Sequence, residues 1–155
     1  MIDRSRNRLR LCVTLLILNL IFIWGNSLLP GEISGALSRW LKELLAPLLG
    51  QKPGEEGGHG LLRKLAHFTE FGCLGLCLSW LVRMLRQRTW EHWALPLVGG
   101  FAVACVDETI QCFVPDRGPG IMDVGIDTAG AAVGIILFSV VYFLRKKEKL
   151  SSEEW

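Results

Sequence analysis

Four apolar stretches dominate this sequence, each close to the roughly twenty residues that a helix needs to cross the hydrocarbon core of a bilayer. Because lipid offers no partner for open backbone groups, a spanning segment must be a helix or part of a closed barrel. No stretch shows the alternating pattern of a barrel strand. The sequence therefore predicts an all-α membrane protein, a bundle of four transmembrane helices over Leu9–Ser27, Leu65–Val82, Ala94–Val114 and Ile121–Leu144.

The first stretch also resembles a secretory signal peptide, because four arginines between Arg4 and Arg10 precede it. The small residues of a cleavage site come late, since Ser34-Gly35-Ala36 lies about ten residues beyond the expected place. We therefore expect an uncleaved membrane anchor.

Basic and acidic residues are unevenly divided between the two ends of the predicted bundle. Eleven of the 17 lysines and arginines fall in the N-terminus, the loop after the second stretch and the C-terminal tail, whereas ten of the 15 acidic residues fall opposite. Since basic loops stay inside, we expect a multi-pass protein of the cell membrane with both termini cytoplasmic. Residues 1–8 would be a basic N-terminus, residues 9–144 the transmembrane domain and residues 145–155 a charged tail.

The segment between the first two stretches predicts a further helix, lying in the outer interface of the membrane. Ser34 is a suitable N-cap, and Arg39, Lys42 and Glu43 fall on the polar face. The apolar side chains that recur at helical spacing are Ile33, Leu37, Trp40, Leu41, Leu44, Leu45 and Leu48.

The net charge and the cysteines give little sign of other chemistry. The formal net charge is only +2 and the basic residues stand at the ends of apolar runs, so we expect no nucleic acid as partner. The five cysteines lack CxxC spacing and are interpreted as small core residues. A disulfide from Cys73 or Cys77 to Cys112 is the alternative.

Ionisable residues enter the apolar stretches, although each charge at a helix centre costs about 2.5 to 3.5 kcal/mol on insertion scales. At a rise of 1.5 Å per residue, Glu70, Asp107 and Asp127 lie roughly 7 to 10 Å inside the same outer boundary. The short connection Pro115–Gly120 makes the last two helices antiparallel neighbours and places Arg117 directly above the acids. We expect one polar site from Lys64, His67, Glu70, Asp107, Glu108, Gln111, Arg117, Asp123 and Asp127.

Two interpretations of this site stay open. In the first, His67 acts as acid or base with Glu70, Asp107 or Glu108, or these groups hold Mg, Mn, Ca or Zn, the metal being undecided. In the second, the acids pair with Arg63, Lys64, His67 and Arg117 as a latch that holds the bundle together. Five acids face only three permanent cations and one histidine, and this imbalance favours the first interpretation.

The last stretch is also rich in small residues. Gly125, Ala129, Gly130 and Gly134 would let another helix approach closely, and Gly130 and Gly134 form one GxxxG motif. We interpret them as packing residues.

Three motifs in order carry a resemblance to a known family. They are RKLAHFTEF at Arg63–Phe71, DETIQCFVPDR at Asp107–Arg117, and the pair Asp123 and Asp127 followed by Gly130. Together they closely resemble the VanZ-like family over about Leu11 to Leu144. The chain departs from the family pattern at Ile110, where a histidine is frequent, and at Asp116, where a glycine is frequent.

The resemblance implies that the nine residues of the polar site are the signature positions of the family. It also implies a role in the cell envelope, since the namesake is linked to low-level resistance to the glycopeptide teicoplanin. We expect a pocket that binds or modifies a lipid-linked cell-wall precursor or a glycopeptide headgroup. A membrane-embedded hydrolase or transferase, and a structural or partner-binding module, are the alternatives; reaction, cofactor and oligomeric state stay open.

Overall fold

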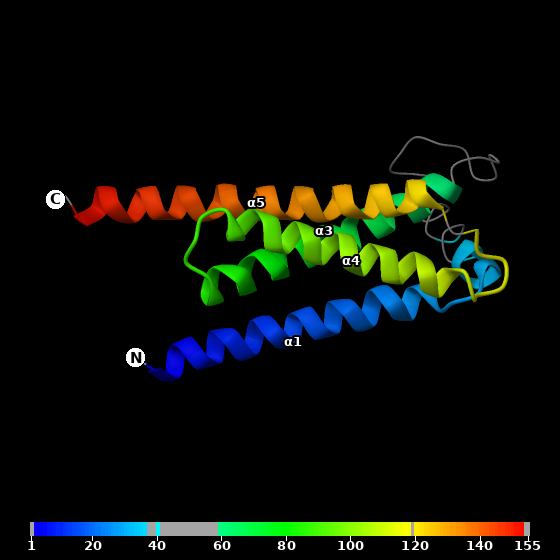
Figure 1. Ribbon diagram of the computed structural model, residues 1–155, viewed down its shortest axis with the longest axis horizontal. Coiled ribbons are helices and arrows are strands. Elements are labelled where there is room, and N and C mark those ends of the chain that lie inside the picture. The colour runs from blue at the N-terminus through cyan, green and yellow to red at the C-terminus, as the bar shows by residue number, and fades with distance from the viewer. Residues whose placement is uncertain (1, 37–39, 41–58, 119, 154–155) are drawn as a thin grey trace.

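The computed structural model describes residues 2–36, 40, 59–118 and 120–153, and within these ranges it is a bundle of four long helices without strands (Figure 1). Each helix is long and apolar enough to cross a membrane. The predicted all-α fold with four spans is confirmed. The helices are α1 (Ile2–Ser27), α3 (His59–Leu85), α4 (Glu91–Gln111) and α5 (Ile121–Glu153).

The helix boundaries differ from the predicted spans in ways that propensity explains. α1 begins within the basic N-terminus, and α5 continues through the charged tail to Glu153, because Arg, Lys and Glu are good helix formers in water. α4 ends at Gln111, three residues before the predicted end at Val114. Pro115 accounts for this early end, since a proline disfavours helical backbone in the residue before it.

The helix predicted in the outer interface is only partly visible. Residues 31–36 are helical and follow directly on Pro30, at the helix start where proline is favoured. The greater part of this helix, from Leu37 to Leu48, lies outside the described residues, apart from Trp40. Its place in the interface stays a prediction.

The outer surface of the bundle is apolar along its length. Phe22 is 62% exposed and Val98 is 64% exposed, with many more large hydrophobic side chains on all four helices. Soluble monomers rarely expose continuous apolar surface on this scale. Lipid is the solvent that this surface fits, so the protein is a multi-pass membrane protein.

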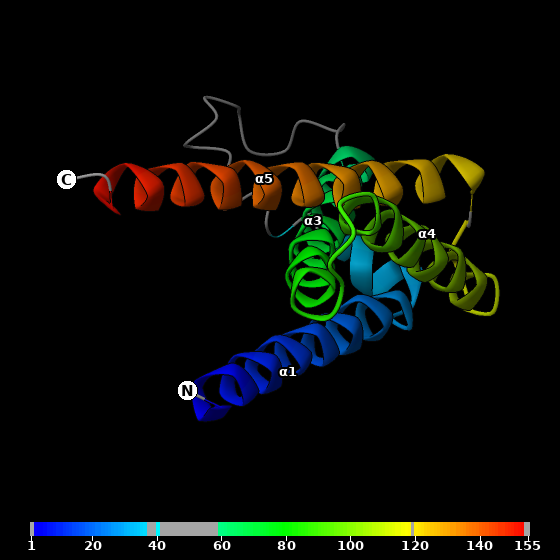
Figure 2. The ribbon, with the colours of Figure 1, turned by 60° about the vertical axis from the view of Figure 1, so that its left-hand side comes forward.

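The interface of α3 and α5 is the closest in the bundle, and glycines make it so (Figure 2). A Cβ added at Gly134 would collide with the backbone oxygen of Gly72, and one added at Gly130 would collide with that of Phe68. The predicted packing role of these two glycines is confirmed. Gly125 and Ala129 do not share it, because Gly125 has open space around it and Ala129 is exposed.

The cysteines do not form a disulfide, and most are not core residues. All five are free, and only Cys12 is fully buried. Cys73 and Cys112 are exposed. The buried apolar core is built instead from Ile23, Phe71, Leu74, Ala104 and Ala131.

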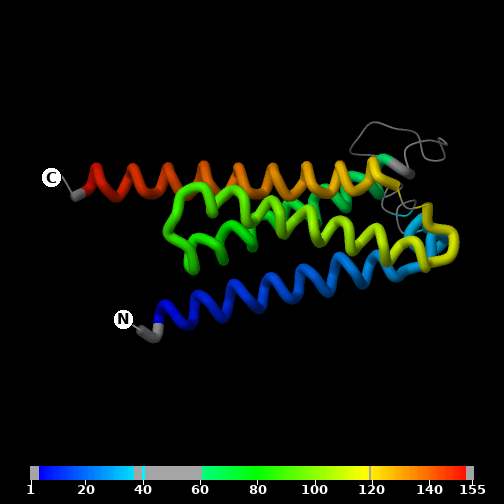
Figure 3. The backbone as a smooth tube through the Cα atoms, viewed as in Figure 1, coloured from blue at the N-terminus to red at the C-terminus, as the bar shows by residue number. Residues whose placement is uncertain are grey.

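The beginning of α1, the end of α5 and the loop at residues 86–90 lie at one end of the bundle, and residues 28–36 and 112–118 lie at the other (Figures 1 and 3). We call these the terminal end and the loop end. The basic clusters therefore gather at the terminal end, and a cytoplasmic position for this end stays a prediction.

The α3–α5 contact can be tested with two glycine substitutions on the same helix. Gly134→Ala should lower the free energy of unfolding by about 1–3 kcal/mol, because its methyl group must displace the backbone of α3. Gly125→Ala should not lower it, because open space receives the methyl group. Thermal unfolding of the purified variants in detergent measures both, and equal effects would contradict this packing.

Candidate functional site

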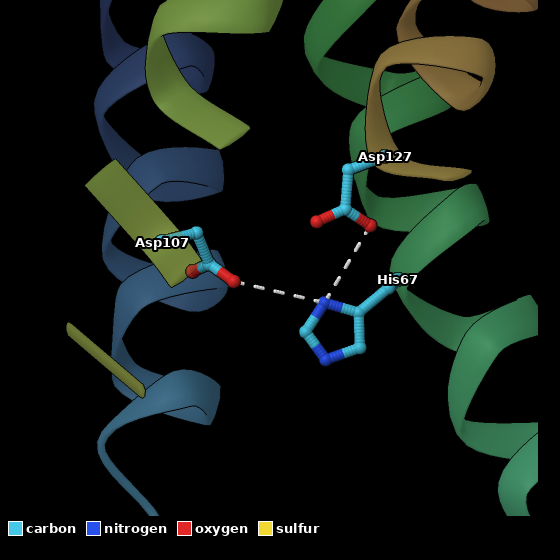
Figure 4. A group of neighbouring side chains, drawn as sticks. All are labelled: His67, Asp107 and Asp127. Carbon is cyan, nitrogen blue, oxygen red and sulfur yellow. Dashed lines mark ion pairs between the residues drawn. The ribbon is translucent and has the colours of Figure 1, made fainter. Parts of the chain in front are cut away.

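Three side chains from three helices meet at the loop end of the bundle (Figure 4). The Nδ1 atom of His67 on α3 lies 3.8 Å from Asp107 Oδ2 on α4 and 3.8 Å from Asp127 Oδ1 on α5. All three side chains are at least nine-tenths buried. The other ring nitrogen of His67 points away from both carboxylates. The imidazole and two of the predicted carboxylates are therefore close neighbours.

These three groups are close without being bonded to one another. A separation of 3.8 Å exceeds the reach of a hydrogen bond. Asp107 Oδ1 and both carboxylate oxygens of Asp127 are buried and have no hydrogen-bond partner. Buried polar atoms are normally satisfied, so unpaired oxygens of this kind call for a missing partner.

Gln111 links two acids of α4 to the end of α1. Its amide nitrogen lies 2.9 Å from Asp107 Oδ2, 3.3 Å from Glu108 Oε1 and 3.4 Å from Ser27 Oγ. An amide carries only two N–H donors, so it serves at most two of these acceptors at a time. The acceptors therefore exceed the donors here too.

Glu108 is held at the beginning of α5. Its Oε2 accepts a hydrogen bond from the backbone N–H of Gly120 at 2.9 Å, directly before the first residue of that helix. A carboxylate is favoured there, because the free N–H groups and the helix dipole make a helix N-terminus positive. Glu108 therefore has a structural partner, unlike Asp127.

Glu70 lies apart from the histidine cluster and faces α1. Asn26 donates its side-chain N–H to Glu70 Oε1 at 3.0 Å, and Asn19 donates to the Glu70 backbone carbonyl at 3.4 Å. The other carboxylate oxygen, Oε2, is buried without a partner. Sequence reasoning gave neither asparagine a role, although two amides seven residues apart in an apolar span mark one face of that helix.

Arg117 is buried, but it donates its hydrogen bonds to backbone carbonyls near the end of α1 and not to the acids. It donates from Nε to the carbonyl of Leu29 at 3.1 Å and from a terminal nitrogen to the carbonyl of Asn26 at 2.7 Å. These carbonyls lie at the C-terminal end of α1, where cations are favoured, and that of Asn26 also accepts a hydrogen bond from the backbone N–H of Leu29 at 3.2 Å. Burial, and then repulsion from Arg63, lowers the pKa of Arg117. Its other terminal nitrogen, Nη1, has no partner.

Lys64 and Asp123 form the outermost pair of the site. Their charged atoms are 3.6 Å apart, and the two side chains are 44% and 23% exposed. An ion pair this open to its surroundings contributes about 0–1 kcal/mol. It does not account for burying the deeper acids.

Two cavities lie at the loop end, and Arg63 lines both. The first, about 10 Å³, is bounded by His67, Glu108, Asp123 and Asp127, and is the size of a single water. The second, about 500 Å³, is a mainly apolar groove between α1 and α3. We call it the α1–α3 groove; its lining is Ile21, Phe22, Gly25, Asn26, Leu29, Ser34, Leu62, Arg63, Ala66 and Glu70.

The cluster also has the composition of a cation site. One ligand atom each from His67, Asp107 and Asp127 lies within 4.8 Å of the others. Oxygen ligands with one imidazole suit Mg, Mn or Ca, and would accept Zn. These three residues are the ones that could hold a metal ion among the described part of the chain.

All nine predicted site residues lie at the loop end, and six of them line the first cavity: Lys64, His67, Glu108, Gln111, Asp123 and Asp127. His67, Asp107 and Asp127 meet at the centre, with Gln111 and Glu108 beside them. Lys64 pairs with Asp123 at the rim, while Glu70 and Arg117 bind the end of α1.

Comparison with protein families gives one match, the VanZ/LLP1 model, over residues 6–142. The chain belongs to the VanZ/LLP1 family. The match extends into all four spans and includes all nine residues of the predicted site, so the VanZ-like resemblance of the three motifs is confirmed. No curated protein and no solved structure matches the chain.

Neutralising Asp127 distinguishes a ligand site from a structural latch. Asp127→Asn should not lower the melting temperature of the purified protein, because neither carboxylate oxygen has a hydrogen bond to lose. A latch would instead lose about 3–5 kcal/mol when one partner is removed.

The matched control is Asp123→Asn on the same helix, whose partner Lys64 is half exposed. It should cost at most about 1 kcal/mol. A large loss of stability in Asp127→Asn alone would mean that the cluster holds the bundle together.

Proposed function

We propose that this VanZ-type membrane protein acts in the cell envelope by binding the polar headgroup of an amphipathic molecule at the loop end of the bundle. The ligand class is a lipid-linked cell-wall precursor or a lipid-tailed glycopeptide such as teicoplanin. The observation that carries the proposal is the set of buried carboxylate oxygens without partners on Glu70, Asp107 and Asp127. Hydroxyl and amino groups of a headgroup would supply the donors that these oxygens lack.

The shape of the α1–α3 groove supports an amphipathic ligand. Its wall of Ile21, Phe22 and Leu62 suits an acyl or prenyl chain, and Asn26 and Glu70 are its polar members. A second cavity of about 460 Å³ continues along the same two helices past Thr69 to Cys73. A hydrocarbon tail would lie along this surface while the headgroup reaches the acids.

The charge distribution supports a site that faces outward. Basic clusters at the terminal end favour a cytoplasmic position for that end. The loop end would then face the outer leaflet, where wall precursors are used and where teicoplanin acts. Arg117, with one guanidinium nitrogen unpaired, adds a donor beside the acids for the headgroup's acceptor atoms.

The function can be tested by neutralising single acids in cells that express the protein. Asp107→Asn and Asp127→Asn should return teicoplanin susceptibility to that of cells with an empty vector, because the ligand's donors lose their acceptors. Binding of teicoplanin and of a lipid-linked precursor to the purified variants gives a second measurement. Protein abundance in the membrane is measured alongside.

The control is Glu32→Gln, which neutralises an exposed carboxylate near the same end of the molecule. It should leave susceptibility and binding unchanged. Wild-type susceptibility and binding in both Asn variants, at normal abundance, would refute a role for the cluster.

A metal-dependent hydrolase or transferase is the second candidate, favoured by the spacing of His67, Asp107 and Asp127. A divalent ion there would offset the excess of negative charge and could polarise a phosphate or carbonyl of the ligand. Elemental analysis of the purified protein should then find one ion per chain, and Asp127→Asn should lose it. Absence of metal together with unchanged lipid products on overexpression would exclude this candidate.

A further inference from the structure

A second polar cavity lies at the terminal end, far from the acidic site. Its volume is about 490 Å³, and residues of α1, α3 and α5 line it. We call it the basic pocket; its lining is Arg8, Trp80, Arg83, Met84, Phe138, Val141, Tyr142 and Arg145. We propose that the basic pocket binds the phosphate group of an anionic phospholipid from the surrounding leaflet.

The charge of the pocket is wholly positive. Three arginines, one from each helix, line it and no acidic residue does. Within the described ranges, no ion pair joins any of the three to an aspartate or glutamate. Three guanidinium groups without a carboxylate partner attract an anion, and their planar N–H donors match phosphate oxygens.

Arg83 is fixed in position by groups that leave its charge uncompensated. Its guanidinium carbon lies 4.3 Å from the ring centre of Tyr142 and 5.5 Å from that of Phe143. One terminal nitrogen donates to the buried hydroxyl of Ser139 at 3.3 Å. The Nε atom is buried and has no partner. The side chain is therefore pre-organised, with donor capacity left for a ligand.

The depth of the pocket matches the level of lipid phosphates. Arg145 comes 24 residues after Ile121, the first residue of α5, which is about 36 Å along a helix. The hydrocarbon core is about 30 Å thick, so Arg145 lies beyond it. Arg83 comes two residues before the end of α3. Trp80 and Tyr142 are of the types that favour the interface.

The remaining lining identifies a lipid as the source of the phosphate. Met84, Phe138 and Val141 give the pocket an apolar wall that a free phosphate ion would leave uncovered. α1 and α5 stand apart at this end in both ribbon views (Figures 1 and 2), and the pocket lies between Arg8 on one and Arg145 on the other. A phospholipid can enter sideways, with its phosphate among the arginines and an acyl chain on the apolar wall.

Lipid binding can be measured on the full chain in detergent, with fluorescent phosphatidylglycerol as the probe and phosphatidylcholine as the neutral comparison. The wild-type protein should bind phosphatidylglycerol at least tenfold more tightly. Arg83→Gln should lose about tenfold, the effect of removing one strong charge-assisted contact. Arg86→Gln is the matched control, because Arg86 is exposed at the same end and does not line the pocket.

Arg8→Gln and Arg145→Gln provide variants that keep the fold intact, since both side chains are exposed; each should also weaken phosphatidylglycerol binding severalfold. Equal losses in Arg86→Gln would mean unspecific attraction to surface charge and would overturn the proposal. Absence of a preference over phosphatidylcholine would overturn it too, as would full displacement of the lipid by an equal concentration of inorganic phosphate. Teicoplanin susceptibility is not expected to change in Arg145→Gln, which separates this site from the acidic one.

Discussion

The close contact of the α3 and α5 backbones is the constraint on which the rest of the molecule depends. Gly130 and Gly134 allow α5 to touch the carbonyls of α3, where any side chain would collide. His67 directly precedes Phe68, whose carbonyl meets Gly130, and Asp127 lies about one turn before Gly130 on α5, so the contact sets their separation. Without it, the imidazole and the carboxylate would be held apart by side chains. The same contact continues toward the terminal end, where Arg83 meets Ser139 and Tyr142.

The two ends of the bundle have opposite chemistry and a common architecture. At the loop end, carboxylates from α3, α4 and α5 gather with too few donors. At the terminal end, arginines from α1, α3 and α5 gather without an acidic partner among the described residues. In a membrane, an unpaired charge is costly wherever it is buried. The loop end is therefore suited to a molecule that offers hydrogen-bond donors, and the terminal end to an anion. Each end adjoins an apolar surface on which a hydrocarbon chain can lie.

The acidic cluster resembles a binding site more than a structural latch because its pairs are incomplete. A latch satisfies its members, as Glu108 is satisfied at the N-terminus of α5. Asp127 has no such arrangement, since its ion-pair partner among the described residues is the imidazole of His67, 3.8 Å away. Proteins keep such destabilising groups where activity needs them, at the expense of stability.

The sequence by itself determined the number of spans, the apolar exterior and the end of the bundle at which the acids lie. Length and hydrophobicity are enough for these, because a bilayer admits few alternatives to a long helix. The motif order was also sufficient to indicate the VanZ/LLP1 family. Spacing along a helix fixes the level of a residue along the bundle, and the predicted common level of Asp107 and Asp127 agrees with their shared neighbour His67.

Only the tertiary structure decided which residues face one another. Lys64, His67 and Glu70 are three apart, and each such step turns about 60° around a helix, so the three point to different neighbours. Lys64 pairs with an acid of α5, and His67 lies beside acids of α4 and α5. Glu70 accepts a hydrogen bond from Asn26 of α1. The rotation of each helix about its own axis depends on which small residues fit its neighbour. Packing therefore decides that Gly130 contacts α3 whereas Gly125 does not, and that Arg117 bonds to α1. The hydropathy of the sequence does not contain this information.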